Sequence, residues 1–386
     1  MNALNTTPHR RLRIAVLNRI FKPTGGGAER YSIALVEQLA SRHEIHVFAQ
    51  QLDHTWPNVS YHKVFAPFDR PRWINQLWFA LATWWMTRRG FDVVHSHENT
   101  WHGQVQTVHV VPVKFSLFHG IVGSQLVLRW VKVITSPRLL AYLCLERYRY
   151  RVYQQRRIVV TSGSLQTVMA QTYPDTQSVM SIVTPGVVSI SEPIGDEEQC
   201  AARLKLGLPT MGRCILFVAN DYRKKGLPAL LEAMRQLPDD CYLAVVGNSA
   251  HIPEFRRELG ESELGKRVHF LGSLRNVDIA YRAADCLAHP TLEDTFAMVV
   301  LEAMAHGVPV VVSGGQFCGI SALLTNASNA LILDNPRDPK KLAEAINRIL
   351  SDGTTALRLE TNGKAFAQAH LWAEMARQQE EIYYSV

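Results

Sequence analysis

Short apolar runs alternate with helical patterns along the first half of the chain. Residues 13–18 centre on an apolar run typical of a buried strand, and residues 28–41 carry apolar positions at helical spacing. A glycine-rich turn at 24–27 joins them, and a second apolar run follows at 44–49. A strand, a glycine turn, a helix and a second strand form a βαβ unit, which predicts a parallel sheet.

The same alternation starts again in the second half. Short apolar or β-branched runs predict further strands at 91–95, 157–161, 214–219, 242–246, 268–271, 286–289 and 308–312. We therefore predict an α/β protein of two doubly wound, Rossmann-like domains, residues 1–188 and 211–365, with residues 189–210 as a linker or an exposed helix. Such sheets bind ligands at the carboxyl ends of their strands, so the expected site lies in a cleft between the domains.

The composition is that of a globular protein, because 47% of the 386 residues are hydrophobic and 19% are charged. The six cysteines are scattered and form no CxxC pair, so neither a disulfide framework nor a zinc site is expected. No apolar stretch approaches the ~20 residues that a membrane span needs. These features predict a cytoplasmic protein that does not cross a membrane.

Charge is divided unequally between the two halves. Residues 1–188 carry 21 lysines and arginines against 9 aspartates and glutamates, whereas residues 189–386 carry 20 against 25. This asymmetry predicts an acidic partner for the first half alone. An anionic membrane surface and a phosphorylated acceptor both fit. No nucleic-acid-binding module is recognisable, so we expect no nucleic acid.

Residues 290–310 predict a loop, a helix, a glycine stop and a strand. Asp294 or Thr295 can cap the helix, and Gly307 can end it. The free amides of a helix N-terminus suit a diphosphate or sugar hydroxyls, and Glu302, two turns further on, suits the two hydroxyls of a ribose. The alternative is that Asp294 is only a cap and Glu302 a solvated helix residue.

This segment resembles the signature of the retaining nucleotide-sugar glycosyltransferases of family 4, which have the GT-B fold. Their pattern is Glu-Gly-Phe-Gly followed by Leu-Glu-Ala-Met, with seven residues between the two acids, as there are between Asp294 and Glu302 here. The resemblance implies that Glu302 holds the donor ribose and that Asp294 faces the donor sugar, together with the amides of Thr295, Phe296 and Ala297. Asp294 is shorter than the usual Glu, so the adjacent Glu293 is an alternative.

The basic turn 220–226 follows an expected strand. Cations there would stabilise the negative charge of a departing diphosphate, although a basic turn can also be simply solvated. The family has a Lys-Gly pair at this place, which Lys225 and Gly226 match, whereas its usual arginine is replaced by Asn220. The resemblance implies that Lys225 is catalytic, and the expected donor-binding set also includes Arg223, Lys224 and Gly247.

Two features of the first half match the family as well. The turn containing Gly25 and Gly26 corresponds to its glycine-rich loop, which lets the backbone approach the donor, although a tight strand-to-helix turn would need glycine anyway. His109 matches a Thr-x-His pattern that lies beside the donor sugar, which implies a catalytic role for it together with Lys225 and Asp294. His95 matches a position of structural role. The histidines do not have metal-ligand spacing, and we expect neither a metal nor a cofactor.

Basic residues interleave with aromatic ones in two stretches of the first half. They suit contact with a membrane surface or an acceptor, or a buried helix with a solvated basic edge. The tryptophans lie at 73, 78, 84 and 85, and the arginines proposed for the contact are Arg147, Arg149, Arg156 and Arg157.

By resemblance, residues 366–386 form a C-terminal helix that crosses back to the first domain. The expected function is transfer of a hexose from a nucleotide-diphosphate sugar, UDP-linked, to a phosphorylated or lipid-linked glycan of lipopolysaccharide or polysaccharide biosynthesis. The enzyme would work at the inner face of the membrane. The alternatives are a non-catalytic scaffold that binds the nucleotide sugar and a nucleotide-sugar epimerase.

Overall fold

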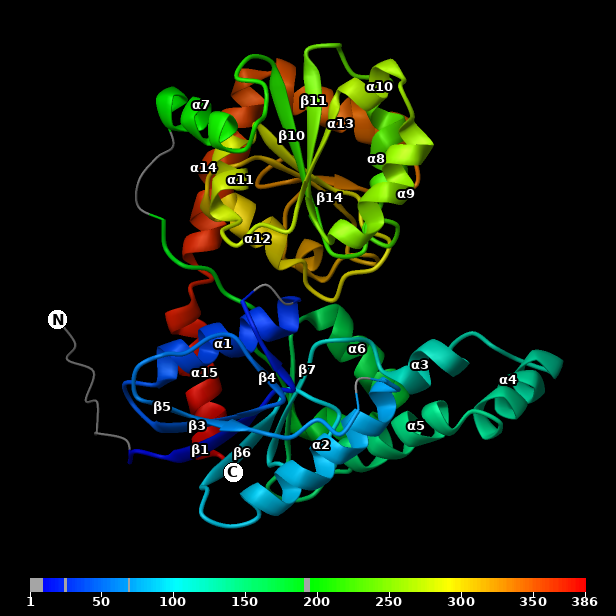
Figure 1. Ribbon diagram of the computed structural model, residues 1–386, viewed down its shortest axis with the longest axis vertical. Coiled ribbons are helices and arrows are strands. Elements are labelled where there is room, and N and C mark those ends of the chain that lie inside the picture. Colours follow the sequence, from blue (N-terminus) through cyan, green and yellow to red (C-terminus); the bar gives the residue numbers. More distant parts are fainter. Residues whose placement is uncertain (1–9, 24–25, 69, 191–194) are drawn as a thin grey trace. The chain divides into compact units, whose positions relative to one another are not determined.

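Two parallel sheets organise the chain, each within its own unit (Figure 1). The computed structural model describes residues 10–23, 26–68, 70–190 and 195–386. Unit 1 comprises Met1–Thr161, Leu165–Val183 and Met375–Val386, and unit 2 comprises Ser162–Ser164 and Thr184–Glu374. The predicted α/β class with two Rossmann-like sheets is confirmed.

The sheet of unit 1 has seven parallel strands in the order β5-β3-β1-β6-β7-β8-β9. A separate short parallel pair, β2 with β4, belongs to the same unit. The strands are β1 Arg13–Leu17, β2 Ile20–Phe21, β3 Glu44–Ala49, β4 Gln51–Leu52, β5 Val59–Lys63, β6 Val93–Ser96, β7 Val105–Val108, β8 Arg157–Val160 and β9 Met180–Ile182.

Helices connect these parallel strands, as crossover connections require. Helix α1 buries Tyr31, Leu35, Val36 and Leu39, an apolar face at helical spacing that packs onto the sheet. The helices that begin in the first 172 residues are α1 Gly27–Leu39, α2 Arg72–Thr87, α3 Val113–Phe118, α4 Ser124–Ile134, α5 Pro137–Arg149 and α6 Gly163–Thr172.

The sheet of unit 2 has six parallel strands in the order β12-β11-β10-β13-β14-β15, which is the Rossmann order. Alternate residues of β10 enter the two cores on its two faces, with Leu216 on one and Phe217 on the other. The elements are α7 Asp196–Lys205, β10 Arg213–Ala219, α8 Leu227–Met234, β11 Cys241–Gly247, α9 Ile252–Leu259, α10 Glu263–Lys266, β12 Val268–Gly272, α11 Asp278–Ala283, β13 Cys286–His289, α12 Met298–Ala305, β14 Val310–Ser313, β15 Leu331–Leu333, α13 Pro339–Ser351 and α14 Gly353–Gln368.

The segment expected as a linker, 189–210, is partly helix. Residues 191–194 lie outside the described residues, but α7 follows them and belongs to unit 2. Its Arg203 is buried, and its guanidinium pairs with the Asp285 carboxylate at 2.8 Å. The acidic composition of the first turn of α7 therefore reflects a helix start rather than a free linker.

The C-terminal helix α15, Trp372–Tyr384, contributes its residues from Met375 onward to unit 1. Its buried Tyr383 hydroxyl lies 2.7 Å from His95 Nδ1, while His95 Nε2 lies 2.6 Å from Thr107 Oγ1. Burial lowers the pKa of His95 to about 3, so the ring is neutral and carries one proton. One nitrogen of His95 therefore donates and the other accepts, which joins α15 to β6 and β7.

Substituting Tyr383→Phe should lower the free energy of unfolding by about 1–3 kcal/mol, because it leaves a buried His95 nitrogen without a partner. Urea or thermal unfolding followed by circular dichroism measures this change. Tyr384→Phe is the matched control, since the Tyr384 hydroxyl donates to the Arg10 carbonyl at an exposed site. Equal stability of the two variants would show that the His95 contact contributes nothing.

Candidate functional site

Two loops meet at the carboxyl edge of the unit 2 sheet, one after β10 and one after β13, which are neighbouring strands. Gly226 has φ +87°, and a Cβ there would lie 1.9 Å from the Pro290 carbonyl oxygen. The Leu292 amide donates to the Lys224 carbonyl at 2.9 Å across the same gap. Only glycine allows this close approach, which brings the basic turn against the acidic loop.

Lys225 and Asp294 form the central contact of this edge. Lys225 Nζ lies 2.5 Å from Asp294 Oδ2 and also donates to the Glu293 carbonyl at 2.9 Å. His289, the last residue of β13, places Nε2 at 3.3 Å from the same Oδ2. Burial of Asp294 opposes its ionisation, but the His289 hydrogen bond and the Lys225 charge outweigh burial and hold the pKa of Asp294 well below its usual range. The carboxylate is therefore ionised at neutral pH.

The two candidate acids of the loop have different surroundings. The Glu293 side chain is 53% exposed and pairs with Lys224, whereas the Asp294 side chain is 17% exposed and pairs with Lys225. An exposed surface pair is weak, while the half-buried pair is desolvated and fixed. The geometry favours Asp294 over Glu293 as the acid of this site.

The start of helix α12 differs from the expectation that Asp294 or Thr295 caps it. The helix begins at Met298, and the residue before it, Ala297, has φ +70°. Asp294 Oδ1 instead accepts hydrogen bonds from the amides of Phe296, at 3.2 Å, and Ala297, at 2.9 Å. Ala297 stands where the family pattern has glycine, which adopts a positive φ without strain. Two of the three amides expected to face a ligand are thus already bound by Asp294.

Glu302 is 8% exposed, which corrects the interpretation of a solvated helix residue. Its Oε2 accepts a hydrogen bond of 2.7 Å from the hydroxyl of the buried Tyr281 on α11. A buried carboxylate needs such partners. Tyr281 orients the carboxylate, and the sequence carried no sign of this role.

The other two cations of the basic turn, Arg223 and Lys224, form ion pairs with carboxylates on the surface of unit 2. Arg223 pairs with Glu254 at 2.6 Å and Glu258 at 2.5 Å, both on α9. Gly247 ends β11, and a Cβ there would lie 1.7 Å from the Ala219 carbonyl oxygen, so glycine is required by packing between β10 and β11. Lys225 is the cation of this turn that contacts Asp294.

Histidines gather at the carboxyl edge of the unit 1 sheet, where β6 and β7 are neighbours. His109 Nε2 lies 2.9 Å from His97 Nδ1, and the His109 ring meets the edge of Tyr31 at 5.1 Å between centroids. Burial, followed by the charge of Arg149, lowers the pKa of His109 to about 3. His109 is therefore neutral at physiological pH and would act through hydrogen bonds rather than charge.

The glycine-rich turn is described only in part. Gly25 lies outside the described residues, and Gly26 precedes α1 in an extended conformation. A Cβ at Gly26 would lie 3.0 Å from Glu29 Oε2, a flexible side-chain atom, so packing alone does not require glycine there.

The four arginines proposed for a membrane or acceptor contact do not share one surface. Arg149 and Arg156 are 6% and 2% exposed and bind carbonyl groups of residues 101–107, which corrects their assignment to a contact surface. Arg157 is half-buried and donates to Ser385, while Arg147 is exposed. Helical spacing did not distinguish the solvated arginines from those that bind the sheet.

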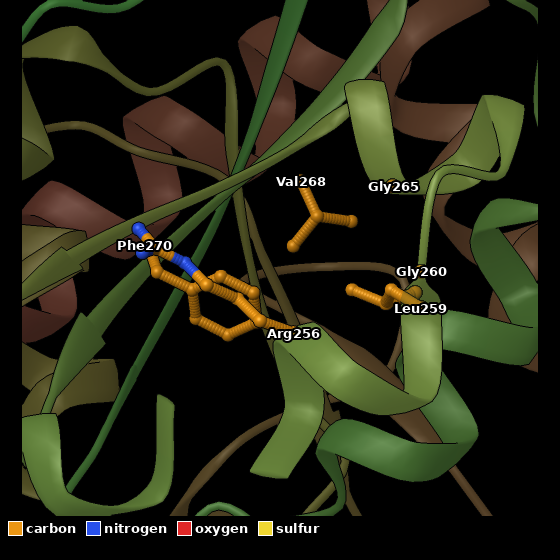
Figure 2. A pocket seen from close by; sticks show the side chains of 6 residues that line it. All are labelled: Arg256, Leu259, Gly260, Gly265, Val268 and Phe270. Atoms are coloured by element: carbon orange, nitrogen blue, oxygen red, sulfur yellow. The ribbon is translucent and has the colours of Figure 1, made fainter. Parts of the chain in front are cut away.

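Figure 2 shows a cavity elsewhere in unit 2, between α9, α10 and the edge strand β12. Its volume is about 260 Å³, and none of its lining residues belongs to the predicted site: Arg256, Leu259, Gly260, Gly265, Val268 and Phe270. Among the described residues, no group of three or more His, Cys, Asp or Glu side chains is placed to hold a metal ion.

Two family models match the chain, one for each half. The model "Glycosyltransferase Family 4" matches residues 25–188, and the model "Glycosyl transferases group 1" matches residues 199–366. The second match contains the Lys225–Asp294 contact and Glu302, and the first contains His109.

Relatives of known sequence match over part of their length. A D-inositol 3-phosphate glycosyltransferase of Corynebacterium urealyticum is 30% identical over 55% of this chain and 53% of its own length. The lipopolysaccharide glucosyltransferase WaaG of Escherichia coli is 25% identical over 60% of this chain and 63% of its own length. The alignment therefore spans about half the length of the first of these relatives.

Solved structures match the fold over nearly the whole chain. The crystal structure of WaaG, described as a glycosyltransferase involved in lipopolysaccharide biosynthesis, has a TM-score of 0.81 at 20% identity and covers 96% of this chain and 99% of its own. Anabaena HepE in complex with UDP-glucose has a TM-score of 0.76 at 18% identity and covers 97% and 100%. With a glycosyltransferase domain matched in each half and this fold throughout, the chain belongs to the glycosyltransferases of the GT-B fold.

Proposed function

We propose that this chain is a retaining, metal-independent glycosyltransferase that transfers a hexose from a nucleoside-diphosphate sugar to a phosphorylated or lipid-linked glycan. The observation that carries the proposal is the Lys225–Asp294 contact at the carboxyl edge of a Rossmann-ordered sheet. Complexes of HepE with UDP and with UDP-glucose support a UDP-linked hexose as the donor. The likeness to WaaG supports an acceptor in lipopolysaccharide or polysaccharide biosynthesis.

The proposed chemistry gives Lys225 and Asp294 separate tasks. When the bond between the sugar and the diphosphate breaks, negative charge grows on the departing phosphate, and the Lys225 ammonium stabilises it. Asp294 is an acceptor for hydroxyls of the hexose, because its carboxylate is ionised and held by backbone amides. Retention of configuration is proposed because the segment that contains both acids resembles the signature of the retaining family.

Glu302 would bind the ribose of the donor. Its carboxylate can accept hydrogen bonds from vicinal hydroxyls, and the Tyr281 hydroxyl orients it from the buried side. His109, which is in unit 1, is proposed to hydrogen-bond the hexose as a neutral imidazole.

The first test is a screen of UDP, ADP, GDP and their glucose conjugates for thermal stabilisation and slow donor hydrolysis. A donor present in large excess over its dissociation constant should raise the melting temperature, because it binds only the folded state. No shift and no hydrolysis with any of these compounds would contradict the proposal. Binding without turnover on acceptor extracts would favour the scaffold, and conversion of the donor without an acceptor would favour the epimerase.

Glu302→Gln should weaken UDP binding by about tenfold, because an amide replaces a carboxylate that accepts both ribose hydroxyls. Glutamine keeps the size of the side chain and an oxygen for Tyr281, whereas Glu302→Ala would open a buried space. Isothermal titration calorimetry measures the affinity, with Glu344→Gln on the exposed face of α13 as the control. An unchanged affinity in a folded variant would remove the ribose role.

Lys225→Ala should lower kcat by about 100-fold and change the affinity for UDP much less, because a leaving-group contact strengthens in the transition state. Steady-state kinetics with the donor found in the screen separates the two effects. Lys266→Ala, at an exposed position of α10, is the control for loss of a lysine. A loss of affinity with normal kcat would place Lys225 in ground-state binding only.

We also propose an anionic bilayer surface as a partner of unit 1, at a different place from the arginines first proposed. Helix α4 exposes Val127, Leu128, Trp130, Val131 and Ile134, each between 48% and 69% exposed. Figure 1 draws α4 at the far end of α5, away from the sheet. An apolar helix without a covering layer is typical of a membrane interface.

The net positive charge of this region also supports an anionic bilayer as its partner. Residues 99–145 contain Lys114, Arg129, Lys132 and Arg138 and no aspartate or glutamate. Near an anionic lipid surface each such cation contributes about 1 kcal/mol. Helix α2, which packs against α5, adds exposed Trp85 with Arg88 stacked over its ring at 3.6 Å. No helix among the described residues has the length and apolar content to cross a bilayer.

Wild-type protein should co-sediment with phosphatidylglycerol vesicles, bind phosphatidylcholine vesicles weakly, and be released by salt. Replacing Val127, Leu128 and Ile134 by Ser, or Arg129 and Lys132 by Gln, should reduce co-sedimentation several-fold without changing donor hydrolysis. Met211→Ser and Leu357→Ser remove exposed apolar side chains from unit 2 and serve as controls. Equal binding to neutral and anionic vesicles would contradict the charge argument, and absence of lipid binding would favour a groove for a soluble phosphorylated acceptor.

A further inference from the structure

The Asp294 carboxylate has all its acceptor positions filled. Oδ1 accepts from the amides of Phe296 and Ala297, and Oδ2 lies within hydrogen-bonding distance of Lys225 Nζ and His289 Nε2. A carboxylate offers about four acceptor positions. A hydroxyl of a donor sugar therefore cannot bind Asp294 until one of these four donors leaves.

Three of the four donors are held in place. The two amides belong to a loop whose backbone is bound on both sides, since the Asp294 amide donates to the Phe317 carbonyl at 2.7 Å and the Gly319 amide donates to the Asp294 carbonyl at 3.0 Å. His289 lies within the sheet, and its side chain is 1% exposed. These three donors cannot move away from Asp294 when a ligand binds.

Lys225 is the donor that can leave. Its side chain is 21% exposed, and its ammonium group is carried by a flexible four-carbon stem. In the proposed function it is also the residue that meets the diphosphate. A doubly charged diphosphate competes with the single charge of Asp294 for the same ammonium.

We propose that donor binding exchanges the partners of Asp294: the diphosphate takes Lys225, a sugar hydroxyl takes the vacated position on Oδ2, and His289 is the positioning residue that keeps the carboxylate in place. The inference rests on the proposed function and adds a residue that the family signature does not contain. The exchange also sets the order in which the parts of the donor bind, because the sugar can bind Asp294 only after the diphosphate has bound Lys225.

His289 is suited to hold the carboxylate once its cation has gone. A half-buried carboxylate without a partner is costly, and a hydrogen bond to an ionised acceptor is stronger than a neutral one. His289 Nδ1 is buried and has no hydrogen-bond partner among the described residues, which fits a neutral ring with its proton on Nε2. Burial lowers the pKa of His289, so the ring stays neutral at physiological pH.

The experiment compares His289→Gln with His289→Asn, two amides of similar polarity. The Gln amide nitrogen occupies nearly the place of the imidazole Nε2 and can reach Asp294, whereas the Asn amide nitrogen corresponds to Nδ1 and falls short. Calorimetry with UDP and UDP-glucose, and kcat and KM for UDP-glucose hydrolysis, are measured for wild type and both variants. His269→Gln, on β12, controls for loss of a half-buried histidine.

UDP should bind wild type and both variants within about twofold, since the diphosphate contact does not involve His289. His289→Asn should lose the additional affinity that glucose gives over UDP and lower kcat by about tenfold, while His289→Gln retains most of both. Equal behaviour of the two variants, with UDP still bound, would overturn the exchange alone. Failure of wild type to bind either compound would overturn the UDP-linked donor of the proposed function and the exchange that rests on it.

Discussion

The site of unit 2 depends on one close approach between two backbone segments. Gly226 lies against the Pro290 carbonyl at a distance that leaves no room for a side chain, and its positive φ turns the chain into α8. The approach sets the basic turn after β10 beside the acidic loop after β13, so that Lys225 and Asp294 are in contact. The backbone thus holds the lysine and the carboxylate within reach of one bound ligand, and groups that are positioned before charge develops stabilise that charge most effectively.

The carboxylates of the site show how a fold keeps charge away from bulk water without leaving it unpaired. Asp294 receives two amides, a lysine and a histidine, and Glu302 receives the Tyr281 hydroxyl. Each contact offsets part of the cost of desolvation. The same rule explains the buried Arg149 and Arg156 of unit 1, which bind backbone carbonyls of β7 and of the loop before it instead of facing solvent.

The histidines of unit 1 serve two purposes at one sheet edge. His95 is held between Tyr383 and Thr107 and ties the last helix to the sheet, while His97 and His109, one residue beyond the ends of β6 and β7, contact each other. Burial keeps all three neutral, so they act through hydrogen bonds. The chain thus joins its C-terminal helix to the strands that present His109.

Sequence periodicity by itself determined the α/β class, most strands near the two sheet centres, and the loop that carries Asp294, because apolar runs and glycine turns are local signals. The family pattern added the proposed roles of Lys225, Asp294 and Glu302. Only the tertiary structure decided that the carboxylate of Asp294 rather than that of Glu293 contacts Lys225. It also decided that His289 and Tyr281 contact the carboxylates of Asp294 and Glu302, and that Arg149 and Arg156 are buried. Those facts depend on which side chains from distant segments of the chain come into contact. A charged side chain can be buried only where partners from other segments form hydrogen bonds or ion pairs with it, and local sequence spacing does not encode those partners.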